Sequence, residues 1–129
     1  MISTIACLED NYAYIVESEG RLAIVDPSEE APVLAALKGR KIDEIWATHH
    51  HLDHVGGIEA LMVRFPNVIV RSSEVDRTRI PGVNDVSESF KFGDSMVRAL
   101  ATPGHTLGAV TYVFGNRSRP FILALRADG

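Results

Sequence analysis

Short apolar runs separated by polar turns dominate the first quarter of the chain. Apolar and aromatic side chains are concentrated at residues 2–7, 12–16 and 22–25, and a turn-prone Ser-Glu-Gly segment at 18–20 separates the last two runs. Runs of this length bounded by turn residues are typical of β-strands. The pattern predicts three strands connected as a meander.

The spacing of apolar residues changes from strand-like to helical after residue 28. Ser28 is a residue type that caps helices, and the two glutamates that follow it suit the positive end of a helix. Apolar residues then recur at helical spacing before Gly39, at Val33, Leu34 and Leu37. We therefore expect a helix that Ser28 caps and Gly39 ends.

A second strand and helix follow in the same order. Residues 42–46 form an apolar run, a histidine-rich loop comes next, and apolar residues then lie on one helical face before Pro66. Residues 68–70 predict another short strand. Alternation of strands and helices favours a layered α/β domain with its functional loop at the carboxyl end of a strand.

The second half of the sequence predicts strands and no further helix. Residues 71–88 are polar and mixed and predict no regular element, whereas 96–101, 109–114 and 121–125 have the composition of strands. With 46% hydrophobic residues over 129 positions and no repeat or low-complexity linker, the sequence predicts one packed domain spanning residues 1–129.

Charge and cysteine content exclude several classes of protein. The net charge of −4 and the scattered lysines and arginines provide no basic surface for nucleic acid. Cys7 is the single cysteine, so neither an intrachain disulfide nor a zinc site built on several thiolates is expected. Residues 1–8 lack the cationic start of a secretory signal, and no apolar run approaches the ~18 residues that a membrane helix needs. We expect a cytoplasmic protein with neither nucleic acid nor membrane as a partner.

All five histidines lie in two places, four within residues 49–54 and one at position 105. In an extended segment, side chains two residues apart project to the same side, so His49 and His51 can point to one position while His50 faces away. Asp53 and His54 can point to a second position a few ångström away. His105, in a Pro-Gly loop, can complete the first position.

This set of side chains is suited to catalytic zinc. Three neutral imidazoles bind zinc and leave a coordination position open for water, whose pKa falls to roughly 7. A second ion about 3.5–4 Å away can share the hydroxide, so hydrolysis needs no serine or cysteine nucleophile. A lone histidine is more often a surface or core residue, which is our interpretation of His50. A metal-scavenging histidine tract is a nearer alternative, but His105 and the strand-loop-helix context argue against it.

Other polar residues near these loops have two interpretations. Asp26 follows the run 22–25 and either caps its own turn or accepts a hydrogen bond that orients a metal-bound loop. Asn11, Tyr12 and Tyr14 can line a pocket, although aromatic residues on strands more often belong to the core.

Residues 48–57, Thr-His-His-His-Leu-Asp-His-Val-Gly-Gly, resemble the T-H-x-H-x-D-H-x-G-G motif of the metallo-β-lactamase superfamily, and within it the glyoxalase II group of hydroxyacylglutathione hydrolases. Residues 10–12, 24–27 and 101–108 extend the resemblance, which runs from residue 2 to about 123. It implies an αββα sandwich with His49, His51 and His105 as ligands of the first metal and Asp53 and His54 as ligands of the second. The implied cofactor is one or two Zn²⁺ ions, with Fe or Mn as alternatives.

The implied reaction is attack of metal-activated hydroxide on the thioester carbonyl of a 2-hydroxyacyl-glutathione such as lactoylglutathione, with Asp53 and His54 as the catalytic residues. The family has a Gly-Asp pair after its next strand, but residues 124–129 read Ala-Leu-Arg-Ala-Asp-Gly, and Asp128 is too late to be the expected bridging ligand. We therefore expect about half of the sandwich, without the substrate-binding region, and binding of a single metal. An uncovered sheet face also predicts a homo-oligomer that covers it.

Two other functions remain open at this point. Related sulfur dioxygenases use one iron on the same fold to oxidise glutathione persulfide, and metal identity separates them from the hydrolases. A non-catalytic metal-binding or interaction module is the alternative from a different class.

Overall fold

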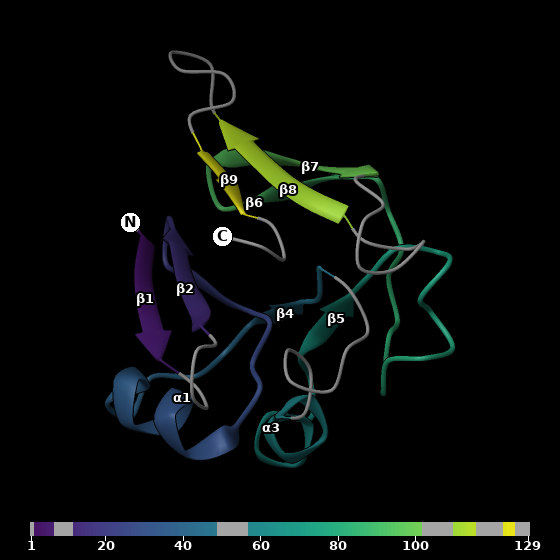
Figure 1. Ribbon diagram of the computed structural model, residues 1–129. Helices are drawn as coiled ribbons and strands as arrows, with labels where there is room; N and C mark the ends of the chain where they lie inside the picture. Colours follow the sequence, from purple (N-terminus) through teal and green to yellow (C-terminus); the bar gives the residue numbers. More distant parts are fainter. Residues whose placement is uncertain (1, 7–11, 49–56, 102–109, 116–122, 126–129) are drawn as a thin grey trace.

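The computed structural model describes residues 2–6, 12–48, 57–101, 110–115 and 123–125. Two sheets and two helices make up the described part (Figure 1). Sheet A has the order β1 (Ile2–Ala6), β2 (Tyr12–Ser18), β3 (Arg21–Val25), β4 (Glu44–Trp46) and β5 (Ile69–Arg71). Sheet B has the order β6 (Ser89–Phe92), β7 (Ser95–Ala101), β8 (Val110–Gly115) and β9 (Leu123–Leu125). The helices are α1 (Glu30–Leu37) and α3 (Ile58–Arg64).

Sheet A combines an antiparallel and a parallel half. Strands β1, β2 and β3 pair antiparallel, which confirms the predicted meander. Strands β3, β4 and β5 are parallel, with Ile24 opposite Ile45 and Ile45 opposite Val70. Parallel neighbours need a crossover, and α1 and α3 lie in the two crossovers. The predicted strand-helix alternation is confirmed.

Alternate side chains of sheet A face two different layers. Leu22 and Ile24 of β3 pack with Val33 and Leu37 of α1 in one core, which also contains Ile58 and Leu61 of α3. Ala23 and Val25, which alternate with them along β3, pack with residues of sheet B in a second core. Figure 1 shows the helices on one side of sheet A and sheet B on the other. The layer order is α, β, β, as the α/β prediction requires.

The outer face of sheet B, which is turned away from sheet A, is more exposed to solvent than its inner face. Along β7, burial alternates, so that Ser95 and Val97 are buried whereas Met96 and Arg98 are exposed. On this face, Met96 is 51% and Leu100 40% exposed. Within the described ranges, no helix covers this face.

Two details of the predicted elements are wrong. Helix α1 has Glu29 as its N-cap, with φ −136° and ψ 146° and no side-chain capping bond, so Ser28 precedes the cap by one residue. Strand β6 was not predicted. It forms a hairpin with β7 in which Phe90 and Phe92 are buried, and Gly93 at the turn has φ +60° and packs against the Ser18 backbone, where a Cβ atom would clash.

Neither described helix has the length or the apolar content that crossing a bilayer requires.

Candidate metal centre

The loop that carries four of the histidines begins where β4 ends. Thr48, the last described residue before segment 49–56, is 1% exposed, and its amide nitrogen donates to Asp26 Oδ1 at 2.8 Å. The Thr48 hydroxyl donates to Asp26 Oδ2 at 2.5 Å. Both oxygens of one buried carboxylate therefore hold the residue next to His49.

Asp26 is fixed in its turn. Its φ of +53° is a left-handed conformation that aspartate tolerates better than most residues, and its amide donates to the Trp46 carbonyl at 2.9 Å. Only 3% of Asp26 is exposed. Of the two interpretations of Asp26, the hydrogen bonds to Thr48 favour the acceptor that orients the adjoining loop.

The residue that follows the same loop is bound to Pro27, the neighbour of Asp26 in the chain. Gly57, the first described residue after segment 49–56, donates its amide to the Pro27 carbonyl at 2.8 Å and is the N-cap of α3. The two residues that flank the eight-residue segment are thus bound to two consecutive residues, Asp26 and Pro27.

The flank of the second histidine segment reaches the same point. Val110, which follows segment 102–109, donates its amide to the Thr48 carbonyl at 2.8 Å. Segment 102–109 contains His105. The structure therefore brings a flank of each histidine segment together at Thr48.

An aromatic cluster in the core between the two sheets packs around the end of β4. Trp46 is fully buried, with its ring centroid 5.0 Å from Phe92 and 5.3 Å from Tyr112. The Tyr112 hydroxyl donates to the Ala47 carbonyl at 2.8 Å. Burial, with a smaller contribution from the Asp26 charge, raises the pKa of Tyr112 far above its usual value, so this hydroxyl stays protonated.

A buried charge cluster connects the central strands at the opposite end of β4. Glu44 is 1% exposed and accepts hydrogen bonds from Arg71 Nε at 2.6 Å, Arg21 Nη2 at 2.8 Å and Trp46 Nε1 at 2.9 Å. The Arg71 guanidinium lies 3.7 Å from the centroid of the Phe90 ring. Sequence analysis missed this cluster, although a glutamate inside the apolar run 42–46 was the available signal.

The five predicted ligands all lie outside the described residues: His49, His51, Asp53, His54 and His105. Four other residues considered in the sequence also lie outside them: Cys7, Asn11, His50 and Asp128. In the described part of the chain, no group of three or more His, Cys, Asp or Glu side chains could hold a metal ion. Tyr14 packs against the core between the sheets, which agrees with the core interpretation. The ligand assignments stay predictions.

The surroundings of the two segments fit a zinc ion. Imidazole nitrogens and a carboxylate are donors that zinc prefers, and the flanks of the segments that carry them meet at Thr48. The Ser28 hydroxyl is buried beside this turn and has no hydrogen-bond partner among the residues whose placement is described. It is a polar group available to a donor from a neighbouring segment.

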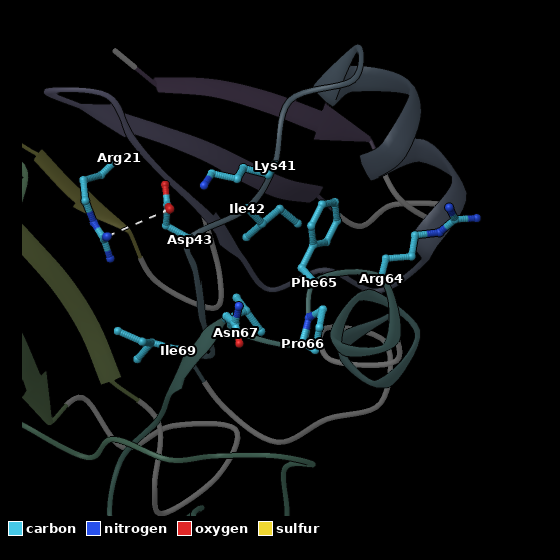
Figure 2. Close-up of a pocket in the computed structure, with 10 residues that line it drawn as sticks. Arg21, Lys41, Ile42, Asp43, Arg64, Phe65, Pro66, Asn67 and Ile69 are labelled. Atoms are coloured by element: carbon cyan, nitrogen blue, oxygen red, sulfur yellow. Dashed lines mark ion pairs between the residues drawn. The ribbon is translucent and has the colours of Figure 1, made fainter.

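A separate surface pocket of about 300 Å³ lies at the amino ends of β4 and β5 (Figure 2). Arg21, one of the cations that line it, pairs with Asp43 at 3.9 Å and with Glu44 at 2.8 Å. Arg64, on the far wall, pairs with Glu30. Because Thr48 follows the carboxyl end of β4, this pocket is at the wrong end of the strand to belong to the histidine loop.

Known proteins resemble this chain in sequence over most of its length. The sequence model of the metallo-beta-lactamase superfamily matches residues 8–123. The hydroxyacylglutathione hydrolase of Gloeobacter violaceus is 40% identical over 121 residues, which cover 88% of this chain and 48% of that protein. The protein of the same name from Synechococcus sp. (strain ATCC 27144) is 42% identical over 120 residues, covering 88% of this chain and 46% of the relative. The chain thus spans about half the length of the curated relatives it matches.

Solved structures share the fold at lower identity. ETHE1 from Myxococcus xanthus superposes with a TM-score of 0.73 at 23% identity, covering 89% of this chain and 54% of the other. A B3 metallo-beta-lactamase with an active-site glutamic acid gives a TM-score of 0.70 at 24% identity, with 81% and 51% covered. These likenesses support the layered fold and say nothing further about chemistry.

Proposed function

The chain belongs to the metallo-beta-lactamase superfamily, and from that premise we propose that it is a metal-dependent hydrolase of 2-hydroxyacyl-glutathione thioesters such as lactoylglutathione. The observation that carries the proposal is the meeting of both histidine flanks at Thr48, because a metal centre needs its ligand segments close together. Relatives named hydroxyacylglutathione hydrolase, about 40% identical over most of this chain, support the substrate class. In this proposal, residues 1–129 correspond to the N-terminal half of a metallo-beta-lactamase-like domain.

Each predicted ligand has a role in this proposal. His49, His51 and His105 hold the first ion as neutral imidazoles, and Asp53 and His54 are the ligands on the side where a second ion binds. Zinc, when bound, lowers the pKa of water to roughly 7 and stabilises negative charge on the carbonyl oxygen. Three imidazoles bind more tightly than two mixed ligands, so we propose about one tightly bound zinc per chain.

The described residues contribute orientation rather than proton transfer. The hydrogen bonds between Asp26 and Thr48 fix the point at which the chain leaves β4 toward His49. Tyr112 keeps its proton and holds the Ala47 carbonyl, so it supports the loop and does not act as an acid. A glutathione thiolate is a good leaving group, and the reaction places no demand on a separate general acid.

The test combines metal analysis with a thioester assay. We expect zinc near one equivalent per chain and hydrolysis of lactoylglutathione that His51→Ala and His105→Ala abolish. His50→Ala is the matched control, because in an extended segment His50 would face away from His49 and His51, and we expect it to retain most of the activity. Equal loss in all three variants, or no effect of any of them, would contradict the assignment.

Other outcomes identify the alternatives. Stoichiometric iron together with persulfide-dependent oxygen uptake would replace the hydrolase with a dioxygenase. Bound zinc without thioester hydrolysis would leave a metal-binding module. The proposed compartment is the cytosol, on the ground that the composition includes one cysteine.

We also propose that copies of the chain associate through the outer face of sheet B, where Met96 and Leu100 are exposed. Light scattering at increasing protein concentration tests this. We expect a mass above that of one chain, which Met96→Lys and Leu100→Lys reduce to one. A single-chain mass at all concentrations would overturn it.

A further inference from the structure

Gly57 is a glycine for reasons of space and not of backbone conformation. Its φ of −89° and ψ of −6° lie in the right-handed region that every residue type adopts. A Cβ atom at this position would lie 2.9 Å from the Glu29 carbonyl carbon and 2.9 Å from the Pro27 carbonyl oxygen. Real Cβ atoms seldom approach backbone atoms so closely, so a side chain here would force the start of α3 away from the turn at residues 26–29.

The backbone contact that needs this space is itself a hydrogen bond. The Gly57 amide donates to Pro27 O at 2.8 Å, and the Gly57 carbonyl accepts the helical bond from the Leu61 amide at 3.0 Å. Gly57 is therefore fixed on one side to the turn and on the other to α3. Both neighbours are main-chain atoms, which cannot rotate away as a side chain would.

We propose that the bond between Pro27 and Gly57 is a positioning device for the histidine loop, in which Gly57 fixes the exit of segment 49–56 as Asp26 fixes its entry. The inference rests on the proposed function, because it concerns the same metal loop. Asp26 and Pro27 are consecutive, with Cα atoms about 3.8 Å apart, so Thr48 and Gly57, the residues that flank the loop, are both bound to one turn. A loop closed in this way spends less conformational entropy when its side chains bind an ion.

The close contacts around Gly57 make the ligand geometry sensitive to the addition of a single methyl group at this position. Metal ligands have to be held within about 0.5 Å of their productive positions. Relief of the contacts that an alanine side chain would make requires a displacement of several tenths of an ångström, since ordinary contacts begin at 3.4 Å. We therefore infer that Gly57→Ala displaces the exit of the loop and weakens metal binding in a chain that is still folded.

The experiment measures zinc affinity by competition with a chromogenic chelator, on wild type, Gly57→Ala and Val33→Ala. Val33 is fully buried beneath sheet A, on α1, so its truncation destabilises the fold without altering the turn. We expect a 10- to 100-fold weaker zinc affinity in Gly57→Ala, about the loss seen when residues that support metal ligands are changed. Val33→Ala should keep the wild-type affinity to within about twofold, because the ligand loop is unchanged.

Amide hydrogen exchange of the metal-free wild type gives an independent measurement. The Gly57 and Thr48 amides should exchange slowly, as hydrogen-bonded groups of the native state do. This result remains informative even where Gly57→Ala fails to fold. A Gly57 amide that exchanges at the rate of an unstructured peptide would overturn the inference.

The outcomes distinguish this inference from the proposed function. A wild-type chain that binds no zinc would reject the metal loop itself. A wild-type chain that binds zinc and a folded Gly57→Ala variant that binds it equally would reject the positioning role alone.

Discussion

The hydroxyl and amide of Thr48 donate to the two oxygens of a single carboxylate, and this pair of bonds controls the residue that precedes His49. A buried carboxylate is stable only when its oxygens are well satisfied by donors. Asp26 and Thr48 therefore stabilise each other, since Thr48 satisfies the carboxylate and the carboxylate fixes Thr48. The amide bond depends only on the backbone, whereas the hydroxyl bond depends on the type of residue at position 48.

Thr48→Val tests the hydroxyl bond alone, because valine has nearly the same shape and keeps the amide. We expect a loss of about 1–3 kcal/mol in the free energy of unfolding, since one buried carboxylate oxygen loses its donor. Thr48→Ser is the matched control, which retains the hydroxyl and should lose less. Urea unfolding of the metal-free chain measures both. A valine variant as stable as wild type would show that the hydroxyl bond contributes nothing.

At the scale of elements, the parallel strands β3, β4 and β5 are joined by charge as well as by backbone hydrogen bonds. Glu44 of β4 binds Arg21 of β3 and Arg71 of β5, and Arg71 also pairs with Asp85 at 3.0 Å. Glu44 and Arg71 are both buried. Removal of the Glu44 charge would leave the buried Arg71 with the partly exposed Asp85 as its only acidic partner among the described residues, and the loss of a buried partner costs far more than the loss of an exposed pair.

Glu44→Gln should therefore lower the free energy of unfolding by about 3–5 kcal/mol. The control is Glu30→Gln, which removes the partner of Arg64 in an exposed pair and should cost less than about 1 kcal/mol. Chemical denaturation of both variants at neutral pH gives the comparison. Similar losses in the two variants would contradict the role of the buried cluster.

The sequence predicts those elements that have their own periodicity. Strand β3 and helix α1 follow from apolar spacing alone, whereas β6 has apolar residues only at Phe90 and Phe92 and directly follows a polar segment that predicts no element. Ser28 was assigned as the cap because capping residues are recognised by type, but the chain is extended for one residue more before α1 begins.

The partner of Asp26 depends on tertiary structure, which explains why sequence reasoning left two alternatives. The parallel register places Val25 opposite Trp46, so the residues after each strand come together although they are 22 positions apart. The ligand motif was visible because its residues are neighbours in the chain. The bonds that hold its ends join segments that only the sheet brings into contact.

For the molecule as a whole, Asp85 and Tyr112 are two described groups whose shifted pKa values connect stability to pH. Burial alone would raise the pKa of Asp85, but hydrogen bonds from Ser87 and the charge of Arg71 outweigh it and lower this pKa below its usual value of 3.8. Stabilisation by Asp85 is therefore complete above the unfolded value and disappears as pH falls through the folded one. The pKa of Tyr112 is raised, so its stabilisation is present below pH 10.0 and disappears as pH rises further.

Unfolding free energies measured across the acidic range test the contribution of Asp85. Asp85→Asn should show a weaker loss of stability than wild type as pH falls below about 4, because the variant has no proton to take up at this position. At neutral pH the same variant should be less stable, since Arg71 loses a charged partner. An acid profile parallel to that of wild type would contradict the assignment.

Metal binding should act on the stability of the entire domain, because an ion that binds the folded chain shifts the unfolding equilibrium by mass action. At a free zinc concentration about 100 times the dissociation constant, the expected stabilisation is about 2.7 kcal/mol. We expect zinc to raise the midpoint of thermal unfolding and a chelator to reverse the increase. His51→Ala and His105→Ala should abolish this shift, although the two residues are 54 positions apart in the sequence. His50→Ala should preserve it. A shift that survives both ligand variants would mean that the two segments do not share one ion.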